Sequence, residues 1–242
     1  MAEQMTDLQI MMQERMNTGT TWTRNEKFER DGYLVIEDLW DPIELYHPVP
    51  DMKGQLNYFD KNPENFNHIE VESQVEGSLA RYWHPQYRTI HSGVRKKLEK
   101  TLGRKLYNTY YYDRYYFPGQ ALSKHADRDA CEISVTVHVS TNLPEDLKDW
   151  EIKIKTPDTY TDKKKTQVLV PGEERTCVLN PGDGMIYKGC ERPHWRDEMP
   201  TPKVSKIFGK KKEATDYYYH QIFFHYVLQD GVRAHCAWDR SR

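Results

Sequence analysis

The 242-residue chain has no run of eighteen apolar residues, so no membrane-spanning helix and no membrane partner are expected. Its N-terminal segment lacks the basic start and the small-residue cleavage site of a secretory signal. The four cysteines, Cys131, Cys177, Cys190 and Cys236, form no CxxC pair, which favours neither a disulfide framework nor a zinc ribbon. These absences predict a protein of a reducing, cytoplasmic compartment.

An excess of charge of one sign is also missing, since 35 basic residues face 37 acidic ones and the formal net charge is −2. This balance gives no indication of bulk attraction to nucleic acid, although local basic patches leave such a partner open. The chain is instead rich in aromatic residues, with 17 Tyr, 7 Phe and 6 Trp, far too many for a disordered chain. Its length predicts one large domain over residues 1–242, and no pattern indicates the oligomeric state.

Helical patterns are confined to the first 105 residues. Apolar residues recur at helical spacing over 5–16, which predicts a short amphipathic helix that packs on the body of the protein. A helical turn is expected over 25–30 and ends near Gly32. The strongest helical pattern begins with Pro85 at the first helical position and ends at Gly103.

Strand patterns dominate after Gly103. The segment 132–140 alternates strictly, with Ser134, Thr136 and His138 on the face opposite the β-branched residues. Further strands are expected at 106–117, 150–155, 167–170, 176–179, 185–187 and 217–228. Two lysine-rich segments, 156–166 and 203–213, are expected to be mobile loops.

Many short strands with Gly and Pro turns, preceded by one long helix, predict a mainly β fold with α support. We expect a double-sheet jelly-roll core over 106–228. Residues 1–105 are expected to supply helical support and the segments on the substrate side.

A metal-binding pattern lies between two predicted strands, at His125-Ala126-Asp127. Residues two apart in an extended segment point the same way, so the imidazole and the carboxylate can reach one ion. This short pattern is common by chance in a chain with 10 His and 37 acidic residues, and it gains weight from His194 downstream. Two histidines and one carboxylate form the facial triad of non-haem iron(II) oxygenases.

These residues resemble the iron(II)/2-oxoglutarate-dependent dioxygenases, and most closely their prolyl-4-hydroxylase-like branch, including its phage and bacterial forms. The resemblance covers roughly residues 28–228. The motifs that carry it are Phe28–Asp38, Tyr116-x-Pro118-Gly119-Gln120, His125-x-Asp127 with the alternating strand after it, and Asn180–Gly184 before His194.

The resemblance implies a double-stranded β-helix of eight core strands, the cupin-like jelly roll. It implies that His125, Asp127 and His194 are the iron ligands and the catalytic centre. The implied reaction uses Fe(II), O2 and 2-oxoglutarate as co-substrate, releases succinate and CO2, and hydroxylates a C–H bond. The expected substrate is a peptidyl proline or another protein or amino-acid side chain, in the cytoplasm of a bacterium or a phage-infected cell.

The far carboxylate of 2-oxoglutarate needs a basic partner, and here the sequence departs from the family pattern. The usual Lys or Arg nine or ten residues past the distal histidine would be Lys203, which lies in a polar loop. Arg196, two residues after His194 and so on the same strand face, offers a fork for a carboxylate and is favoured. A surface ion pair with Asp197 or Glu198 is the plainer role for Arg196.

The resemblance also implies that Tyr116, Thr136 and His138 contact the co-substrate. Other protein side chains, free amino acids, small molecules and nucleobases stay open as substrates. Two rival functions also stay open: a catalytically idle cupin-like binding or structural module, and a metal-dependent hydrolase or isomerase on a similar barrel.

Overall fold

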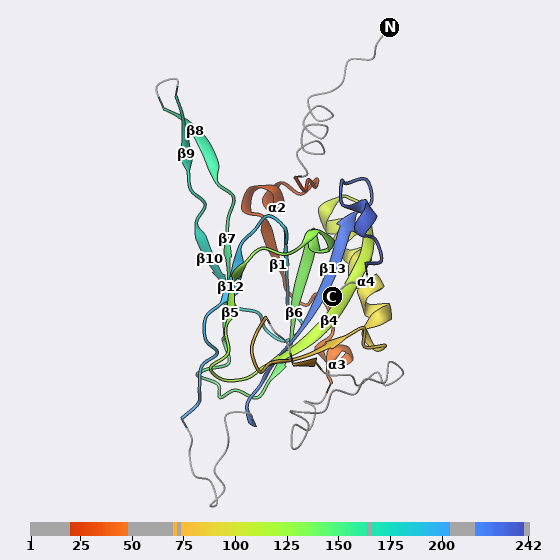
Figure 1. Cartoon of the computed structure of the whole chain (residues 1–242), viewed down its shortest axis with the longest axis vertical. Helices are drawn as coiled ribbons and strands as arrows, with labels where there is room; N and C mark the ends of the chain where they lie inside the picture. Colours follow the sequence, from red (N-terminus) through yellow and green to blue (C-terminus); the bar gives the residue numbers. More distant parts are fainter. Residues whose placement is uncertain (1–19, 48–69, 72–73, 164–165, 204–215, 240–242) are drawn as a thin grey trace, which may run out of the picture.

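The computed structural model describes residues 20–47, 70–71, 74–163, 166–203 and 216–239. The helix predicted over 5–16 and most of the loop predicted over 203–213 lie outside these residues. Eight core strands are divided between two sheets that lie side by side in Figure 1.

The larger sheet has seven strands in the order β1-β11-β6-β13-β4-β3-β2. Its strands are β1 (Tyr33–Ile36), β2 (Glu70–Val71), β3 (Leu79–Tyr82), β4 (Leu106–Tyr116), β6 (Ile133–Thr141), β11 (Gly184–Tyr187) and β13 (Tyr219–Leu228). The smaller sheet has the order β10-β7-β12-β5. Its strands are β5 (Leu122–His125), β7 (Ile152–Lys155), β10 (Glu174–Cys177) and β12 (His194–Arg196). The eight core strands are β4–β7 and β10–β13. They alternate between the two sheets along the chain, except that β7 and β10 both lie in the smaller sheet, and this is the double-stranded β-helix that the sequence predicts.

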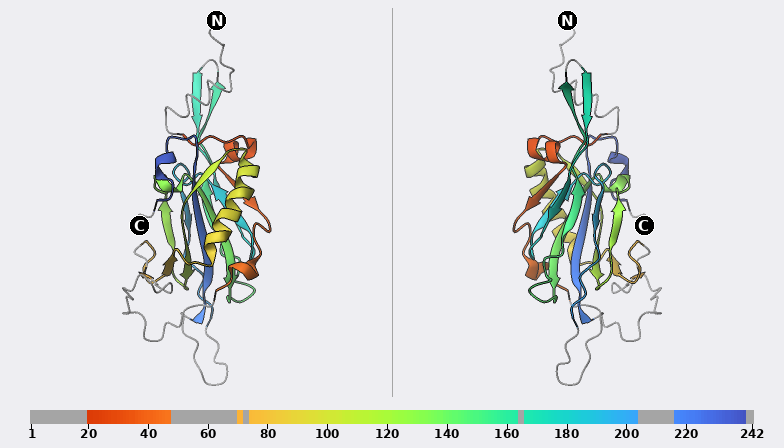
Figure 2. Two further views of the ribbon diagram at one scale, coloured as in Figure 1. Left: turned by 90° about the vertical axis from the view of Figure 1, so that its right-hand side faces the viewer. Right: turned by 90° about the vertical axis from the view of Figure 1, so that its left-hand side faces the viewer.

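Helices cover the outer face of the larger sheet. Helix α4 (Tyr87–Leu102) crosses this face, as the left view of Figure 2 shows, and α2 (Glu26–Asp31) and α3 (Pro42–Leu45) flank it. The predicted start of α4 is wrong by two residues: Tyr87 N–H bonds to the His84 carbonyl, so Pro85 lies in a turn before the helix. Gly103 ends the helix as expected, in the left-handed region with φ 65°.

The alternation predicted for β6 is confirmed. Its β-branched residues pack with α4 in the main core, where Val135 and Val137 are fully buried. The opposite face of β6 turns into the barrel and brings Ser134, Thr136 and His138 inside, each at most 3% exposed. The barrel interior is therefore polar, and it can hold charged groups that a hydrocarbon core would exclude.

One predicted loop is partly a β-hairpin. Strands β8 (Thr159–Lys163) and β9 (Thr166–Val170) pair antiparallel and project beyond the barrel in Figure 1, so the mobile loop predicted over 156–166 is wrong there. Cross-strand pairs of aromatic, aliphatic and β-branched residues, such as Tyr160 with Leu169, favour pairing despite the nearby lysines. The strand predicted over 167–170 is part of this hairpin.

Candidate metal centre

Three side chains from the smaller sheet converge at one end of the barrel. His125 ends β5 and is paired in register with His194, the first residue of β12, while Asp127 follows β5 directly. One ligand atom from each of the three lies within 4.8 Å of the other two. Asp127 Oδ1 is 3.5 Å from His125 Nε2 and 3.6 Å from His194 Nε2. The structure thus brings together the three residues that the sequence singled out.

Backbone carbonyls orient both imidazoles. His125 Nδ1 lies 2.7 Å from the Ser123 carbonyl, and His194 Nδ1 lies 3.0 Å from the Arg192 carbonyl. A carbonyl oxygen can only accept a hydrogen bond, so Nδ1 carries the proton in each neutral ring. Each Nε2 therefore keeps its lone pair and faces Asp127, which is the arrangement of metal-binding histidines.

Asp127 is held as a carboxylate with one oxygen turned to the imidazoles. Its backbone N–H bonds to the Gly189 carbonyl, and Ser134 Oγ donates to Oδ2 at 2.7 Å. Burial alone would raise the pKa of Asp127, but the neighbouring His194 and His125 imidazoles and the hydrogen bond from Ser134 hold it well below its usual range. Oδ1 is left as the ligand atom.

The two histidines differ in their electrostatics. Burial lowers the pKa of His194, which favours the neutral ring that a metal requires. Burial also opposes protonation of His125, but the protonated ring can donate to Asp127 as well as to the Ser123 carbonyl, and this raises the pKa of that ring. Two imidazole nitrogens and one carboxylate oxygen suit a divalent transition metal such as iron(II), so the donor set fits such an ion.

Gln74 reaches the same site from the irregular segment just before β3. Its side-chain Nε2 lies 3.0 Å from His125 Nε2, and its Oε1 accepts a hydrogen bond of 2.9 Å from Arg114 Nη2. Gln74 therefore donates to the lone pair that a metal ion would use. Arg114, on β4, is 1% exposed and also donates to the Tyr116 hydroxyl at 3.0 Å.

A second group of potential ligands, Asp127, Cys131 and His225, shares Asp127 with the first. Burial raises the pKa of the Cys131 thiol well above its usual value, so it stays protonated and is a poor metal ligand. His225 Nδ1 lies 3.0 Å from Ser134 Oγ. His225 thus contacts Ser134, and Ser134 in turn donates to Asp127 Oδ2.

Arg196 lies inside the barrel and is 1% exposed. Its Nη1 donates to the Trp150 carbonyl, and its guanidinium carbon lies 4.6 Å from the Trp150 ring centre and 5.1 Å from that of Tyr219. Its Nε and Nη2 form no hydrogen bond with the part of the chain that the structure describes. Lys203, in contrast, is exposed.

The other sequence candidates lie around the same interior. The Tyr116 ring meets Trp150 edge-on at 5.0 Å. Thr136 Oγ1 accepts a hydrogen bond of 2.9 Å from Gln221 Nε2. His138 stacks on Tyr219 at 4.1 Å, the ring that also lies against Arg196.

Sequence reasoning missed several polar residues of this interior: Gln74, Arg114, Ser134 as a partner of Asp127, Gln221 and His225. The alternation of β4 carries a signal for one of them, because it sets Arg114 on the same face as Tyr116. No local signal marks Gln74, which lies in an irregular segment.

No family model matches the chain, and no curated protein matches it by sequence. Solved structures do match. A Pseudomonas putida prolyl-4-hydroxylase superposes with a TM-score of 0.50 at 12% identity, over 83% of this chain and 95% of that one. The non-heme alpha-ketoglutarate-dependent epimerase SnoN, from nogalamycin biosynthesis, superposes with a TM-score of 0.53 at 11% identity, over 90% of this chain and 83% of that one. HygX from Streptomyces hygroscopicus, solved with nickel, 2-oxoglutarate and hygromycin B, superposes with a TM-score of 0.50 at 10% identity, over 83% of this chain and 84% of that one.

The chain has the fold of the 2-oxoglutarate oxygenases. This confirms the fold that the sequence resemblance implied. A low identity with a shared fold leaves the function to be argued from the site itself. Among the described helices of this oxygenase fold, none is long and apolar enough to cross a membrane.

Proposed function

We propose that the protein is an iron(II)- and 2-oxoglutarate-dependent oxygenase. The observation that carries the proposal is the convergence of two Nε2 lone pairs and one ionised carboxylate at one end of this barrel. A bound iron(II) would supply the activation of O2 that couples the conversion of 2-oxoglutarate to succinate and CO2 with oxidation of a substrate C–H bond. Three protein ligands on one side would leave positions open for the co-substrates.

In this proposal His125 and His194 bind the metal through Nε2 and Asp127 binds it through Oδ1. The carbonyls of Ser123 and Arg192 keep each imidazole in the tautomer that can act as a ligand. The folded chain therefore orients both imidazoles before a metal ion binds.

Arg196 would hold the far carboxylate of 2-oxoglutarate. Two of its nitrogens, Nε and Nη2, have no hydrogen-bond partner among the described residues, inside a barrel walled by Trp150 and Tyr219. An unsatisfied buried donor costs about 1–3 kcal/mol, and a carboxylate that accepts from both nitrogens would remove that cost. Tyr116, Thr136 and His138 would also contact the co-substrate, and the His138 ring stacks on Tyr219.

A peptidyl proline or another protein side chain is the substrate class that we favour. The likeness in fold to a prolyl-4-hydroxylase supports it, as does the β8–β9 hairpin. Lys155, the last residue of β7, bonds through its N–H to the Pro193 carbonyl beside His194, so the hairpin rises from the metal end of the barrel. Its Tyr160 and Leu169 are 68% and 49% exposed, which suits contact with a polypeptide.

A small-molecule substrate is the second candidate. It is supported by the likeness in fold to HygX, which was solved with hygromycin B, and to SnoN, which is named an epimerase.

The test is succinate formation from 2-oxoglutarate in the presence of iron(II), across a panel of proline-containing peptides. The expected result is coupled turnover with some peptides and slow succinate release without them, both lost in Asp127→Ala. An absorption band should also appear when 2-oxoglutarate is added to the iron(II) protein without oxygen. Absence of succinate and of the band, together with wild-type iron affinity in Asp127→Ala, would contradict the proposal.

A further inference from the structure

Gln74 lies on the open side of the candidate metal centre. Its amide reaches His125, whose side chain is 24% exposed, whereas the side chain of His194 is only 3% exposed. Gln74 is itself an exposed residue. A small molecule that binds an ion at this centre would therefore approach it past His125 and Gln74.

The chain around Gln74 is anchored although it is irregular. Val75, the next residue, is 2% exposed and packs in a buried apolar cluster. Ser78 N–H donates to the Val75 carbonyl at 3.0 Å, and Gln120 Nε2 donates to the Glu76 carbonyl at 3.0 Å. These contacts fix the backbone from which the Gln74 side chain extends.

Arg114 determines which end of the Gln74 amide faces the metal centre. Arg114 is 1% exposed, and its guanidinium carbon lies 5.4 Å from the ring centres of both Tyr112 and Tyr116. A guanidinium group can only donate, so the Gln74 atom that it meets at 2.9 Å is the carbonyl oxygen Oε1. The amide nitrogen must then point toward His125.

The amide nitrogen is therefore a donor at the metal centre. One N–H is directed at His125 Nε2, 3.0 Å away, and the hydrogen bond from Arg114 to Oε1 polarises the amide and strengthens that donor. A metal ion on His125 Nε2 would use the lone pair that now accepts this bond. The Gln74 N–H would then need another acceptor beside the ion.

A bound molecule offers a better acceptor than Asp127 does. Asp127 Oδ1 faces the imidazoles as the ligand atom, and Oδ2 already accepts a hydrogen bond of 2.7 Å from Ser134. The carboxylate beside the oxo group of a 2-oxo acid has to lie at the ion if the acid is to react there. Its negative charge makes it a strong acceptor for a polarised N–H.

We propose that Gln74 is a co-substrate-binding residue, which donates through Nε2 to the carboxylate beside the oxo group of 2-oxoglutarate. Arg114 is the positioning residue that holds the amide in this orientation. Gln74 and Arg196 thus recognise the two different carboxylates of 2-oxoglutarate. The role of Gln74 rests on the proposed oxygenase function, and the experiment has to separate the two.

Oxalate is a suitable probe because it presents a carboxylate to the ion and lacks the far carboxylate that Arg196 would hold. The full chain is titrated with oxalate and with 2-oxoglutarate by calorimetry, at a manganese(II) concentration that saturates every variant. Gln74→Leu should weaken the binding of both ligands about tenfold, the lower end for a hydrogen bond to a charged group. Arg196→Met should weaken only 2-oxoglutarate, and Gln86→Leu is the matched control.

Metal affinity separates a lost donor from a damaged site. Gln74→Leu should bind manganese(II) at least as tightly as the wild type, because it frees His125 Nε2. A disrupted barrel would instead weaken metal and oxalate together. Gln74→Glu keeps an acceptor for Arg114 but turns a carboxylate oxygen to the centre, and it should weaken oxalate binding further than Gln74→Leu does.

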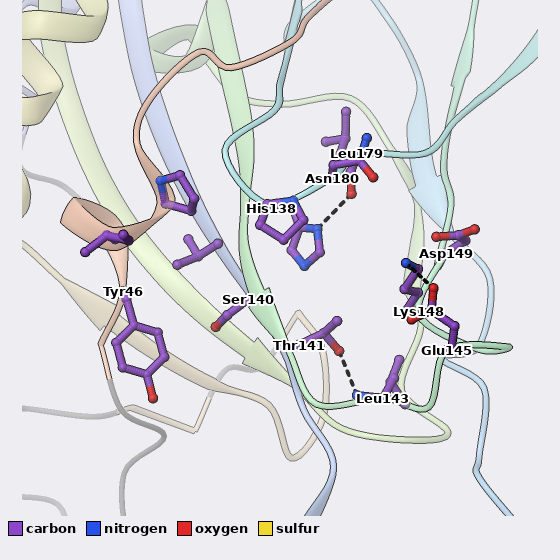
Figure 3. Close-up of a pocket in the computed structure, with 14 residues that line it drawn as sticks. Tyr46, His138, Ser140, Thr141, Leu143, Glu145, Lys148, Asp149, Leu179 and Asn180 are labelled. Atoms are coloured by element: carbon purple, nitrogen blue, oxygen red, sulfur yellow. Dashed lines mark hydrogen bonds and ion pairs between the residues drawn. The ribbon is translucent and has the colours of Figure 1, made fainter.

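The cavity drawn in Figure 3 requires a second control. It has a volume of about 550 Å³, lies toward the end of β6 opposite Ser134, and is lined neither by Gln74 nor by the three candidate metal ligands. Oxalate in that cavity would bind without an ion. The metal-free protein should therefore show no oxalate binding at concentrations that saturate the manganese-loaded protein.

Gln74 has no such role if the wild type binds 2-oxoglutarate and Gln74→Leu binds both ligands equally well. The same holds if Gln74→Leu weakens 2-oxoglutarate but not oxalate, if its metal affinity falls along with its oxalate affinity, or if oxalate binds without manganese. If the loaded wild type binds neither ligand, the proposed oxygenase function fails as well.

Discussion

Ser134 Oγ lies 2.7 Å from Asp127 Oδ2 and donates its hydrogen to that oxygen. The same Oγ lies 3.0 Å from His225 Nδ1. Because the only hydroxyl hydrogen of Ser134 is directed at the carboxylate, His225 must be the donor in the second bond. Burial lowers the pKa of His225 to about 4, so this ring is neutral at pH 7 and acts by orientation rather than by charge. The chain of bonds from His225 through Ser134 determines which oxygen of Asp127 faces the two imidazoles.

Ser134→Ala is therefore expected to weaken metal binding about tenfold, because loss of a bond that orients a ligand typically costs ten- to a hundredfold in affinity. Titration with manganese(II) or iron(II) without oxygen measures this. Ser140→Ala is the matched control, since Ser140 lies on the same strand and its Oγ has no hydrogen-bond partner in the described residues. Equal affinities in the two variants would show that Ser134 does not orient Asp127.

Gln74 competes with a metal ion for His125, which leads to the opposite expectation. Gln74→Leu removes the donor that lies 3.0 Å from His125 Nε2 and should strengthen metal binding by up to about tenfold, the net value of one hydrogen bond. The same titration measures it. Gln86→Leu, which alters an amide bound to the Glu44 carbonyl far from this site, serves as the control. A weaker affinity in Gln74→Leu would mean that Gln74 assists the site through Arg114.

The parts of the site that sequence reasoning predicted are those that depend on local pattern. The spacing of His125 and Asp127 and the strict alternation after Glu132 are properties of single strands, so they can be interpreted without knowledge of the fold. No local pattern links His194 to them; the chemistry of a two-histidine, one-carboxylate triad suggested it, and the resemblance then supported it.

The missed residues depend on pairing between distant segments. Gln74 meets Arg114 and His125 only because the segment leading to β3 lies beside the open end of β5. Arg114 lies in a strand so rich in tyrosine that its alternation is hard to see. The buried cluster of Arg81, Asp113 and His220 was missed for a similar reason, since its three members come from three different strands.

Asp113 lies in a fully buried charge cluster on the opposite face of β4 from Arg114. It pairs with Arg81, and its Oδ2 lies 2.8 Å from His220 Nε2. Burial alone would raise the pKa of Asp113, but the bonds to His220 and Arg81 hold the pKa below its usual value. A carboxyl whose pKa is lower in the folded state stabilises the fold above its unfolded pKa of about 3.9, and this contribution is lost as the pH falls through the folded value.

Asp113→Asn should lower the free energy of unfolding at neutral pH by about 3 kcal/mol, because it leaves Arg81 buried without its counter-charge. It should also reduce the loss of stability between neutral pH and about pH 3. Urea unfolding at both pH values measures the two effects. Asp31→Asn, which breaks the exposed pair with Arg30, should change little. If the free energy of unfolding of Asp113→Asn falls as much between neutral pH and about pH 3 as that of the wild type, this account is contradicted.

Arg196 and Lys203 give a direct comparison for 2-oxoglutarate binding. Arg196 is buried, and two of its nitrogens have no partner in the part of the chain that the structure describes, whereas Lys203 is exposed and lies outside the barrel strands. Arg196→Met should weaken 2-oxoglutarate binding about a hundredfold, the value of two charge-assisted hydrogen bonds at the lower end of their range. Lys203→Met should leave it unchanged.

Titration of the manganese(II)-loaded protein with 2-oxoglutarate, followed by calorimetry, measures both affinities. Because the Arg196 guanidinium lies over the Trp150 ring, the fluorescence of Trp150 should report the same event. Metal affinity in Arg196→Met should match the wild type, since Arg196 contacts none of the three ligand side chains in the hydrogen bonds described; this separates a lost carboxylate partner from a disrupted barrel. Equal losses of 2-oxoglutarate affinity in Arg196→Met and Lys203→Met, or a loss in Lys203→Met alone, would contradict the assignment of the far carboxylate to Arg196.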